Sequence, residues 1–227
     1  MLLKKVRKKA LKEDNDLFSY PFRFISTIIT KLLLKTNVTP TIITIIHVFI
    51  GIISAILFGF GEYYLTVIAA LLFTLSYILD LADGEIARYK GVTSKFGGWL
   101  DHITDHMLLF FAIVGIALGN FRNTQNNDIL ILALFALTFT AVVALIVIGK
   151  VVNTKLNKLK AVRMPFGFKM SKKIHVGSFT ISFLVLTIGA LLKQEKTMFY
   201  FYIIMIFLMV IRAFTHRVKL MQMDTEE

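Results

Sequence analysis

Apolar segments of membrane-spanning length recur along the chain, with short polar stretches between them. Six such segments cover residues 41–60, 63–79, 100–119, 128–149, 174–192 and 197–211. A helix needs about 20 apolar residues to cross the hydrocarbon core of a bilayer. Helices are expected because backbone polar groups in lipid must bond within their own segment, and no stretch alternates with the period of a barrel strand. The pattern predicts an all-α integral membrane protein with six transmembrane helices.

A seventh apolar element precedes the first span, at residues 17–35. Pro21 stands near its start, and Arg23, Lys31 and Lys35 are spaced along it. Charges distributed in this way are typical of an amphipathic helix that lies in the headgroup layer instead of crossing it. We therefore predict three parts, which are a cytoplasmic basic tail with an N-terminal interfacial helix at 1–40, a six-helix transmembrane catalytic domain at 41–216, and a cytoplasmic tail at 217–227.

The composition agrees with a membrane protein. Of the 227 residues, 56% are hydrophobic, and the mean hydropathy is +0.73, which is too apolar for an ordinary soluble domain. The chain has no cysteine, so it has no disulfide and no thiolate chemistry, and the redox compartment stays open. The first residues are too charged, and lack the long apolar core, for a cleavable signal peptide.

The net charge of +12 has a topological explanation. All but three of the 26 Lys and Arg residues fall on one side of the predicted membrane, and the exceptions are Arg122, Lys193 and Lys196. Cytoplasmic loops carry such an excess, so we expect both termini and the acidic stretch described below to face the cytoplasm. Because topology accounts for the excess, no nucleic-acid partner is expected. The basic run at residues 4–12 could also attract anionic membrane lipid.

A second basic run, at residues 150–173, joins the fourth and fifth predicted spans. In one interpretation it is a topology signal only. In the other it captures a phosphorylated acceptor molecule, with Arg163 and Lys172 as candidate contacts. The sequence leaves both interpretations open.

The stretch DLADGEIARYKGVTSKFGGWLDHITD at residues 80–105 holds four aspartates at the edge of the predicted membrane. One helical face, at the spacing i, i+3, i+4, i+7, carries Asp80, Asp83, Gly84 and Ala87. A second face, with a spacing of four, carries Gly97, Asp101 and Asp105. Gly91 lies in the connection and lets the chain turn back. Two adjacent antiparallel helices would then direct two carboxylates each into a common cleft.

Four ionised carboxylates this close repel one another, so either some of them are protonated or metal ions occupy the cleft. Oxygen ligands without a nearby cysteine favour Mg²⁺, with Mn²⁺ or Ca²⁺ as alternatives. Four carboxylates can hold two divalent ions about 4 Å apart, an arrangement that stabilises the entering and leaving oxygens in phosphoryl transfer. A helix rises about 21 Å from Asp105 to Gly119, which puts the cleft just inside the cytoplasmic boundary of a core about 30 Å thick.

The spacing Asp80-x2-Asp83-Gly84-x2-Ala87-Arg88-x8-Gly97-x3-Asp101-x3-Asp105 resembles the signature of the CDP-alcohol phosphotransferase (CDP-alcohol phosphatidyltransferase) family, with every signature position filled. The six-span plan and the N-terminal interfacial helix are also similar to that family. Residues 38–44 resemble the family's Thr-Pro-Asn segment before the first span, with Thr41 where Asn is common.

The resemblance implies an enzyme of phospholipid biosynthesis. It would transfer a phosphatidyl-type group, which is a substituted phosphoryl group, from a CDP-linked lipid donor to a small polar acceptor alcohol and release CMP. Inositol phosphate or glycerol phosphate is the acceptor that we expect. The family likeness also implies a homodimer in the cell membrane, with the active site at the cytoplasmic face.

The same resemblance implies a role for each residue of the signature. Asp80, Asp83 and Asp101 would ligate two Mg²⁺ ions, or Mn²⁺, that grip the pyrophosphate of the donor. Asp105 would complete the metal site and act as the general base. The nucleotide contacts would come from Gly84, Arg88, and Thr93 or Ser94. The Arg88 fork suits bidentate binding of phosphate oxygens.

Two other functions fit a carboxylate-rich membrane cleft. An ion-coupled membrane transporter would carry its acids at mid-bilayer in broken helices and show an internal repeat. Here the acids cluster at one face and no repeat is visible. A membrane prenyltransferase also uses acidic motifs with Mg²⁺, but on two well-separated loops. We therefore favour the phosphotransferase and keep the transporter as the alternative.

Histidines could add nitrogen ligands. His102 and His106 are spaced i, i+4 and could ligate a transition metal. Helical geometry turns them about 100° from the aspartate face, so we expect supporting or packing roles. His47, His175 and His216 stand alone near the ends of spans, and no functional role is expected for them.

Overall fold

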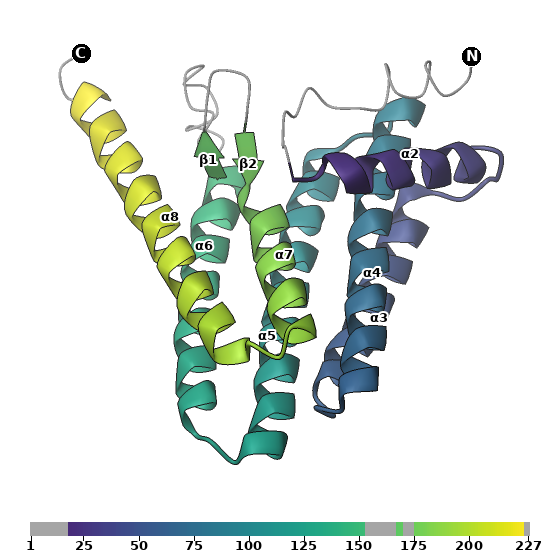
Figure 1. The fold of residues 1–227 in the computed structure, drawn as a ribbon. Coiled ribbons are helices and arrows are strands. Elements are labelled where there is room, and N and C mark those ends of the chain that lie inside the picture. The colour runs from purple at the N-terminus through teal and green to yellow at the C-terminus, as the bar shows by residue number, and fades with distance from the viewer. Residues whose placement is uncertain (1–17, 153–166, 170–174, 225–227) are drawn as a thin grey trace.

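The computed structural model describes residues 18–152, 167–169 and 175–224. Within these ranges the chain forms seven helices and one short antiparallel ribbon (Figure 1). The helices are α2 (Tyr20–Leu33), α3 (Pro40–Phe58), α4 (Tyr63–Lys90), α5 (Lys95–Thr124), α6 (Asp128–Val152), α7 (Ser178–Leu191) and α8 (Glu195–Asp224), and the strands are β1 (Gly167–Lys169) and β2 (His175–Gly177). The basic tail at 1–17, and Arg163 and Lys172 of the basic linker, lie outside the described residues.

Four helices, α3, α4, α5 and α6, are long and apolar enough to cross a membrane, judged by length and composition. They correspond to the first four predicted spans. α4 has 28 residues and is about 42 Å long at 1.5 Å per residue, so it extends beyond a hydrocarbon core about 30 Å thick. The helical membrane architecture is supported in the described chain, whereas the predicted count of six spans is not confirmed.

The fifth and sixth predicted spans differ from the helices that the structure has there. Residues 175–177 form β2 instead of helix, and α7 has only 14 residues. Such a helix is shorter than the roughly 20 residues that crossing requires. α7 begins late because the backbone of β2 pairs with β1, and three-residue strands carry no periodic signal that could have predicted them. The sixth predicted span lies inside α8, which has 30 residues.

The outside of the bundle is apolar. Ile45 and Phe49 of α3, Leu71 of α4 and Leu145 of α6 are large hydrophobic side chains that stay exposed. Continuous apolar surface of this kind marks contact with a membrane or another protein. Together with the four long apolar helices, it is consistent with an integral membrane protein.

α2 lies across the end of the bundle (Figure 1) and packs on α4. Its polar residues Ser26, Thr27 and Thr30 are buried against the bundle, whereas Phe24 and Leu32 are exposed. A helix with its polar side inward and its apolar side outward suits the membrane surface, where the apolar side chains can enter lipid. These contacts support the predicted interfacial helix, with bounds slightly shorter than 17–35.

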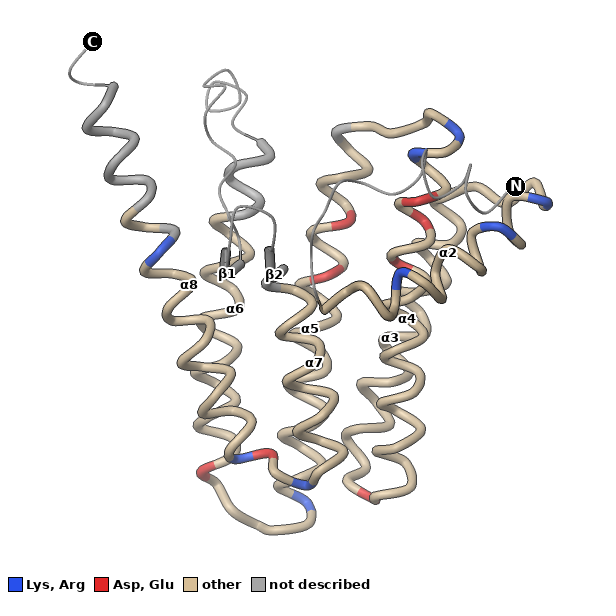
Figure 2. The backbone as a smooth tube through the Cα atoms, turned by 45° about the horizontal axis from the view of Figure 1, so that its top comes forward, with Lys and Arg blue, Asp and Glu red and all other residues tan. Residues whose placement is uncertain are grey.

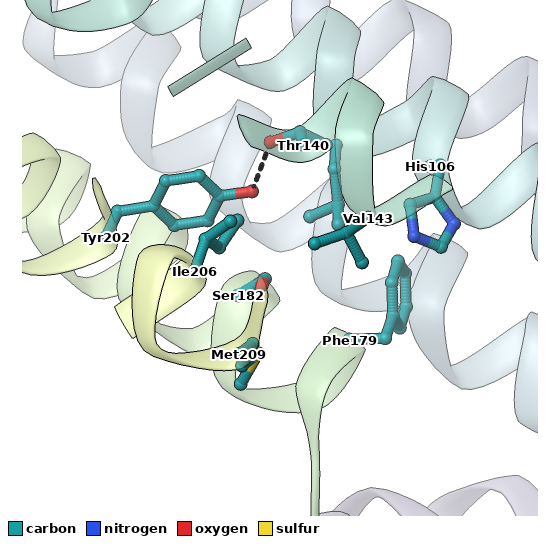
Figure 3. Close-up of a pocket in the computed structure, with 9 residues that line it drawn as sticks. His106, Thr140, Val143, Phe179, Ser182, Tyr202, Ile206 and Met209 are labelled. Atoms are coloured by element: carbon teal, nitrogen blue, oxygen red, sulfur yellow. Dashed lines mark hydrogen bonds between the residues drawn. The ribbon is translucent and has the colours of Figure 1, made fainter. Parts of the chain in front are cut away.

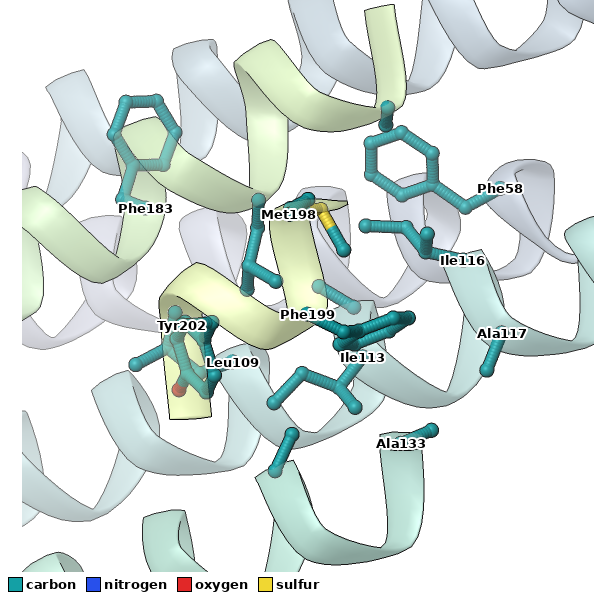
Figure 4. Packing of buried hydrophobic residues seen from close by; sticks show 14 of the residues in the cluster. Phe58, Leu109, Ile113, Ile116, Ala117, Ala133, Phe183, Met198, Phe199 and Tyr202 are labelled. Atoms are coloured by element: carbon teal, nitrogen blue, oxygen red, sulfur yellow. The ribbon is translucent and has the colours of Figure 1, made fainter. Parts of the chain in front are cut away.

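The hydrophobic core draws on most of the helices. Phe58 of α3, Ile113 of α5, Ala133 of α6, Phe183 of α7 and Phe199 of α8 all belong to one buried cluster, part of which Figure 4 shows. Close packing of such side chains is what holds membrane helices together, since lipid offers no hydrophobic driving force between them. α5 therefore has a position that its neighbours determine.

α3 and α5 approach most closely at glycines of α5. A Cβ atom on Gly115 would meet the backbone carbonyl oxygen of Ala55, and one on Gly119 would meet that of Phe58. Small residues four apart allow membrane helices to bring their backbones together in this way. The contact sets the position of α5 relative to α3, and both helices contribute residues to the site described below.

We predict that Gly115→Ala destabilises the protein by about 1–3 kcal/mol, because the added methyl group overpacks the contact with α3. Thermal unfolding in detergent would measure the loss. Gly98→Ala is the matched control, since Gly98 lies in the same helix with nothing within 4 Å of an added Cβ. Alanine is the better helix former, so this control should keep or raise the melting temperature. Equal losses in the two variants would contradict the packing argument.

Candidate active site

α4 and α5 are joined by a tight connection at residues 91–94. α4 ends at Gly91, whose φ of 72° lies in the left-handed region that favours glycine. α5 begins after Ser94, whose side-chain oxygen accepts a hydrogen bond from the backbone N–H of Gly97 at 2.9 Å. The turn predicted at Gly91 is confirmed.

The two acidic helices are not direct neighbours over their length. α4 and α5 make few direct contacts in the described chain, and α3 packs against both of them. The prediction of two adjacent helices was therefore incomplete, since it left out the third helix that holds them. The acidic side chains of α4 and α5 lie toward the same end of the bundle as α2 (Figure 2).

Each of these helices supplies two of the four aspartates. Asp80 and Asp83 belong to α4, and Asp101 and Asp105 belong to α5. Asp83 and Asp105 are buried, and the other two are partly buried. The carboxyl group of Asp80 lies near enough to the other three to interact with them electrostatically. The structure thus brings the four residues together, as their spacing predicted.

α3 adds two side chains that the sequence analysis did not assign to the site. The Oγ1 hydroxyl of Thr44 donates to Oδ2 of Asp83 at 2.7 Å. Nε2 of His47 lies 3.6 Å from Oδ1 of Asp80 and 3.8 Å from Oδ2 of Asp83. The signal that could have found them is their spacing of three on one face of an otherwise apolar helix.

Two groups of side chains could each hold a metal ion. In the first, ligand atoms of His47, Asp80 and Asp83 lie within 4.8 Å of one another, and in the second the same is true of Asp101, His102 and Asp105. His102 therefore reaches the acids of its own helix, which its helical angle had not predicted. The imidazole is long enough to cover that step along the helix surface.

The chemistry of these groups fits a divalent cation. Both ring nitrogens of His47, Oδ1 of Asp80 and Oδ1 of Asp105 are buried, with no hydrogen-bond partner in the described chain. A polar atom left in that condition costs about 1–3 kcal/mol. Cations among the carboxylates would pair with these atoms and offset their mutual repulsion. Oxygen-rich ligands suit Mg²⁺ or Mn²⁺.

A cleft of about 530 Å³ opens beside the aspartates, and Asp83 and Asp101 are part of its wall. This volume is within the range of small-molecule and cofactor sites. The wall includes all four residues predicted to contact the nucleotide, namely Gly84, Arg88, Thr93 and Ser94. Pro40 and Thr41, from the segment before the first span, also line it.

Basic side chains surround the cleft on the α4 side. A Cβ on Gly84 would lie 3.0 Å from Nη1 of Arg88, so the Arg88 side chain folds over the glycine. Lys90, which the sequence analysis did not single out, also lines the cleft. Its Nζ donates to the backbone carbonyl oxygen of Val38 at 2.8 Å, which ties the end of α4 to the segment before α3. A wall with two cations suits an anionic ligand such as a phosphate.

Glu85, next to Gly84, anchors α2 to the cleft wall. Its side chain is fully buried. Ser26 donates to Oε1 at 2.7 Å, and Thr30 donates to Oε2 at 2.8 Å. Both carboxylate oxygens are thereby paired by hydroxyls of the interfacial helix, so the position of α2 and the position of this turn of α4 depend on each other.

A second cavity, of only about 20 Å³, lies among α5, α6, α7 and α8 (Figure 3). His106 and Phe179 line it, together with Tyr202, whose hydroxyl is 2.9 Å from Oγ1 of Thr140. A space of this size accommodates little more than one water molecule. This surrounding supports the packing role predicted for His106.

A helical membrane protein with clustered carboxylates beside a cationic cleft has the parts that phosphoryl transfer in a membrane requires. Residues 37–218 match the family model described as CDP-alcohol phosphatidyltransferase. The match covers most of the chain, so the protein belongs to the CDP-alcohol phosphatidyltransferase family, whose members are transferases of substituted phosphate groups.

Two curated relatives match part of the chain. Over 93 residues it is 36% identical to the archaetidylinositol phosphate synthase of Pyrococcus horikoshii, which covers 40% of this chain and 47% of that protein. Over 100 residues it is 39% identical to the bifunctional IPC transferase and DIPP synthase of Thermococcus kodakarensis, which covers 43% of this chain and 22% of that protein. The matched segments thus span less than half the length of either relative.

One solved structure has a similar fold. It is the crystal structure of the Mycobacterium tuberculosis phosphatidylinositol phosphate synthase (PgsA1) with CDP-DAG bound. The TM-score is 0.60, and the superposition covers 84% of this chain and 94% of that one. The sequences are 19% identical, so this likeness bears on the fold alone.

We predict that Ser26→Ala and Thr30→Ala each destabilise the protein by about 1–3 kcal/mol, because each leaves a buried oxygen of Glu85 without its donor. Thermal unfolding would measure the loss, and limited proteolysis should cut α2 faster. Thr138→Ala is the control, since that exposed hydroxyl bonds only to the backbone of its own helix. If the control loses as much stability as the two variants, the anchor has no special role.

Proposed function

We propose that this protein transfers a phosphatidyl-type group from a CDP-linked lipid donor to an acceptor alcohol and releases CMP. The observation that carries the proposal is the single cleft in which Asp83 and Asp101 share a wall with Gly84 and Arg88. Membership of the family supports the reaction class.

Asp80, Asp83, Asp101 and Asp105 would hold two Mg²⁺ ions, and Mn²⁺ suits the same ligands. When bound, the ions would neutralise charge on the pyrophosphate of the donor and on the departing CMP. The orphaned buried oxygens of Asp80 and Asp105 support this assignment.

The nucleotide end of the donor would lie along α4 and the connection to α5. Gly84 has no side chain, so a phosphate can approach the helix there, and the Arg88 fork would bind its oxygens. Ser94 uses its oxygen as a cap acceptor, and its O–H is still able to donate to the ligand. Thr93, on the same wall, would add a second hydroxyl.

Asp105 would act as the general base. It would accept the proton of the acceptor hydroxyl as that oxygen forms its bond to the β-phosphorus of the donor. The bond from the β-phosphorus to the bridging oxygen breaks, and CMP leaves with the bonding electron pair. Asp105 is buried, and its Oδ1 has no hydrogen-bond partner in the described chain, so that oxygen can take a proton without breaking a hydrogen bond within the protein.

Inositol phosphate is the acceptor that we propose, with glycerol phosphate as the second candidate. The support comes from the names of the relatives, since the Pyrococcus protein is an archaetidylinositol phosphate synthase and the structural neighbour is a phosphatidylinositol phosphate synthase.

We further propose that the cleft faces the cytoplasm and that the enzyme is a homodimer in the cell membrane. The asymmetric distribution of basic residues supports the orientation, and the family likeness supports the dimer. Because the chain has no cysteine, single cysteines at Lys35 and Asn127 can be labelled from either side of intact vesicles. Labelling of both from the same side would contradict the orientation, and the absence of a cross-linked pair in membranes would contradict the dimer.

The direct test incubates the purified protein with CDP-lipid, Mg²⁺ and a panel of acceptors, which are inositol phosphate, glycerol phosphate, inositol and serine. We expect CMP release with inositol phosphate, loss of that release on chelation, and its return when Mg²⁺ is added back. Absence of CMP release with every acceptor would overturn the proposal and return attention to ion transport.

In the same assay, Asp105→Asn should lower turnover by about 10²- to 10⁴-fold and leave CDP-lipid binding within a few-fold of native. Asp128→Asn is the control, because Asp128 is an exposed acid of the opposite end that pairs with Lys196 at 2.9 Å. If Asp105→Asn weakens binding as much as rate, Asp105 retains the metal and is not the base.

A further inference from the structure

His47 is a buried imidazole that the proposed reaction does not use. It lies on α3, one helical turn after Thr44, and 1% of its surface is exposed. Nε2 faces both acids of α4, at 3.6 Å from Asp80 and 3.8 Å from Asp83. The residue thus reaches the acidic centre from a helix outside the aspartate-containing stretch.

Neither ring nitrogen of His47 has a hydrogen-bond partner in the described chain. The distances to the two carboxylates exceed those of a hydrogen bond. Ser76 is close by, but its hydroxyl donates to the backbone carbonyl oxygen of His47 and not to the ring. A buried imidazole without partners is costly, so the group that pairs with this ring comes from outside the described protein chain.

We propose that Nε2 of His47 is a ligand of the divalent ion held by Asp80 and Asp83, which makes that centre a mixed nitrogen and oxygen site. The inference rests on the proposed function, because it adds a ligand to the same metal centre. Two neighbouring ligands, each about 2.1 Å from an octahedral ion, lie about 3 Å apart. Separations of 3.6 and 3.8 Å therefore need only a small contraction to accept an ion.

Thr44 supports this arrangement from the same helix. Its hydroxyl donates to Oδ2 of Asp83 at 2.7 Å, and hydrogen bonds of this kind orient the carboxylates that bind metals. α3 would thus supply both a ligand and the group that orients a second ligand.

A nitrogen ligand changes which ion the centre prefers. Carboxylates and water suit Mg²⁺, whereas imidazole adds affinity for transition metals such as Mn²⁺. His47 would then determine metal specificity, so the native protein should favour Mn²⁺ over Mg²⁺ more strongly than a variant without the imidazole.

The competing arrangement is a ring that bonds to water. A cavity of about 10 Å³ adjoins His47 and is also lined by Ser76, Tyr77, Asp80 and Asp105. That volume is near the smallest that holds one water molecule. A ring paired with water would keep its nitrogen away from the ion, and spectroscopy of the ion distinguishes the two arrangements.

The experiment loads the purified full-length protein with Mn²⁺ and records electron spin echo envelope modulation, which detects nitrogen nuclei bonded to the ion. Since His102 could also bind an ion, the comparison is made in a His102→Gln background. We expect imidazole modulation in His102→Gln and its loss in His47→Gln/His102→Gln. His106→Gln is the matched control, because that ring lines the separate small cavity, and its modulation should equal the native signal.

Two further measurements complete the test. In Mn²⁺ titrations, His47→Gln should bind about tenfold more weakly, with a smaller change for Mg²⁺. His47→Asp keeps a ligand without nitrogen, so in the His102→Gln background it should retain Mn²⁺ and lose the modulation, which separates ligand loss from misfolding. Modulation that is absent in His102→Gln, or that survives removal of His47, overturns this inference while the proposed function stands. Failure of the native protein to bind Mn²⁺ or Mg²⁺ at all would overturn both.

Discussion

Repulsion among carboxylates in a poorly hydrated cleft is the constraint that organises this protein. Asp83 and Asp105 are buried on two different helices, and Asp80 interacts electrostatically with all three other aspartates. Such repulsion strengthens as water is excluded. The arrangement is favourable when cations lie among the acids, and the surrounding helices must hold the carboxylates in place for those cations. Helix packing and metal chemistry are therefore two sides of one energetic problem.

α3 connects those two sides. Near its C-terminal end, Ala55 and Phe58 pack against glycines of α5, where backbones approach more closely than any side chain would allow. Near its N-terminal end, Thr44 and His47 face the acids of α4. One helix thus sets the distance between the acidic helices and contributes polar groups to the site that they form. A packing change at one end of α3 would be felt as a change of geometry at the other.

The interfacial helix joins this arrangement through a single buried acid. Glu85 follows Gly84 on α4, and two hydroxyls of α2 pair its oxygens. The exposed apolar side of α2 suits the membrane surface, where a lipid substrate would arrive. The cleft wall is therefore tied to the element that lies closest to the lipid headgroups, which gives the active site a fixed depth relative to the membrane.

Local spacing along the chain was enough to predict the features that depend on one helix at a time. The aspartate faces, the Gly91 turn and the amphipathic character of α2 follow from the helical period and from the conformational freedom of glycine. The sequence therefore determined by itself which acids share a face and where the chain reverses. It did not determine where α7 begins, because pairing of the β2 backbone with β1 depends on a strand that carries no periodic signal.

Only the tertiary structure decided which helices meet. The part played by His47, the burial of Glu85 and the position of α3 against both acidic helices each depend on residues far apart in the sequence. An isolated histidine in an apolar run is the same in sequence whether its ring faces lipid, core or carboxylates. That choice is made by the packing of whole helices, in which close glycine contacts and buried hydrogen bonds select one arrangement among many that the hydrophobic pattern allows.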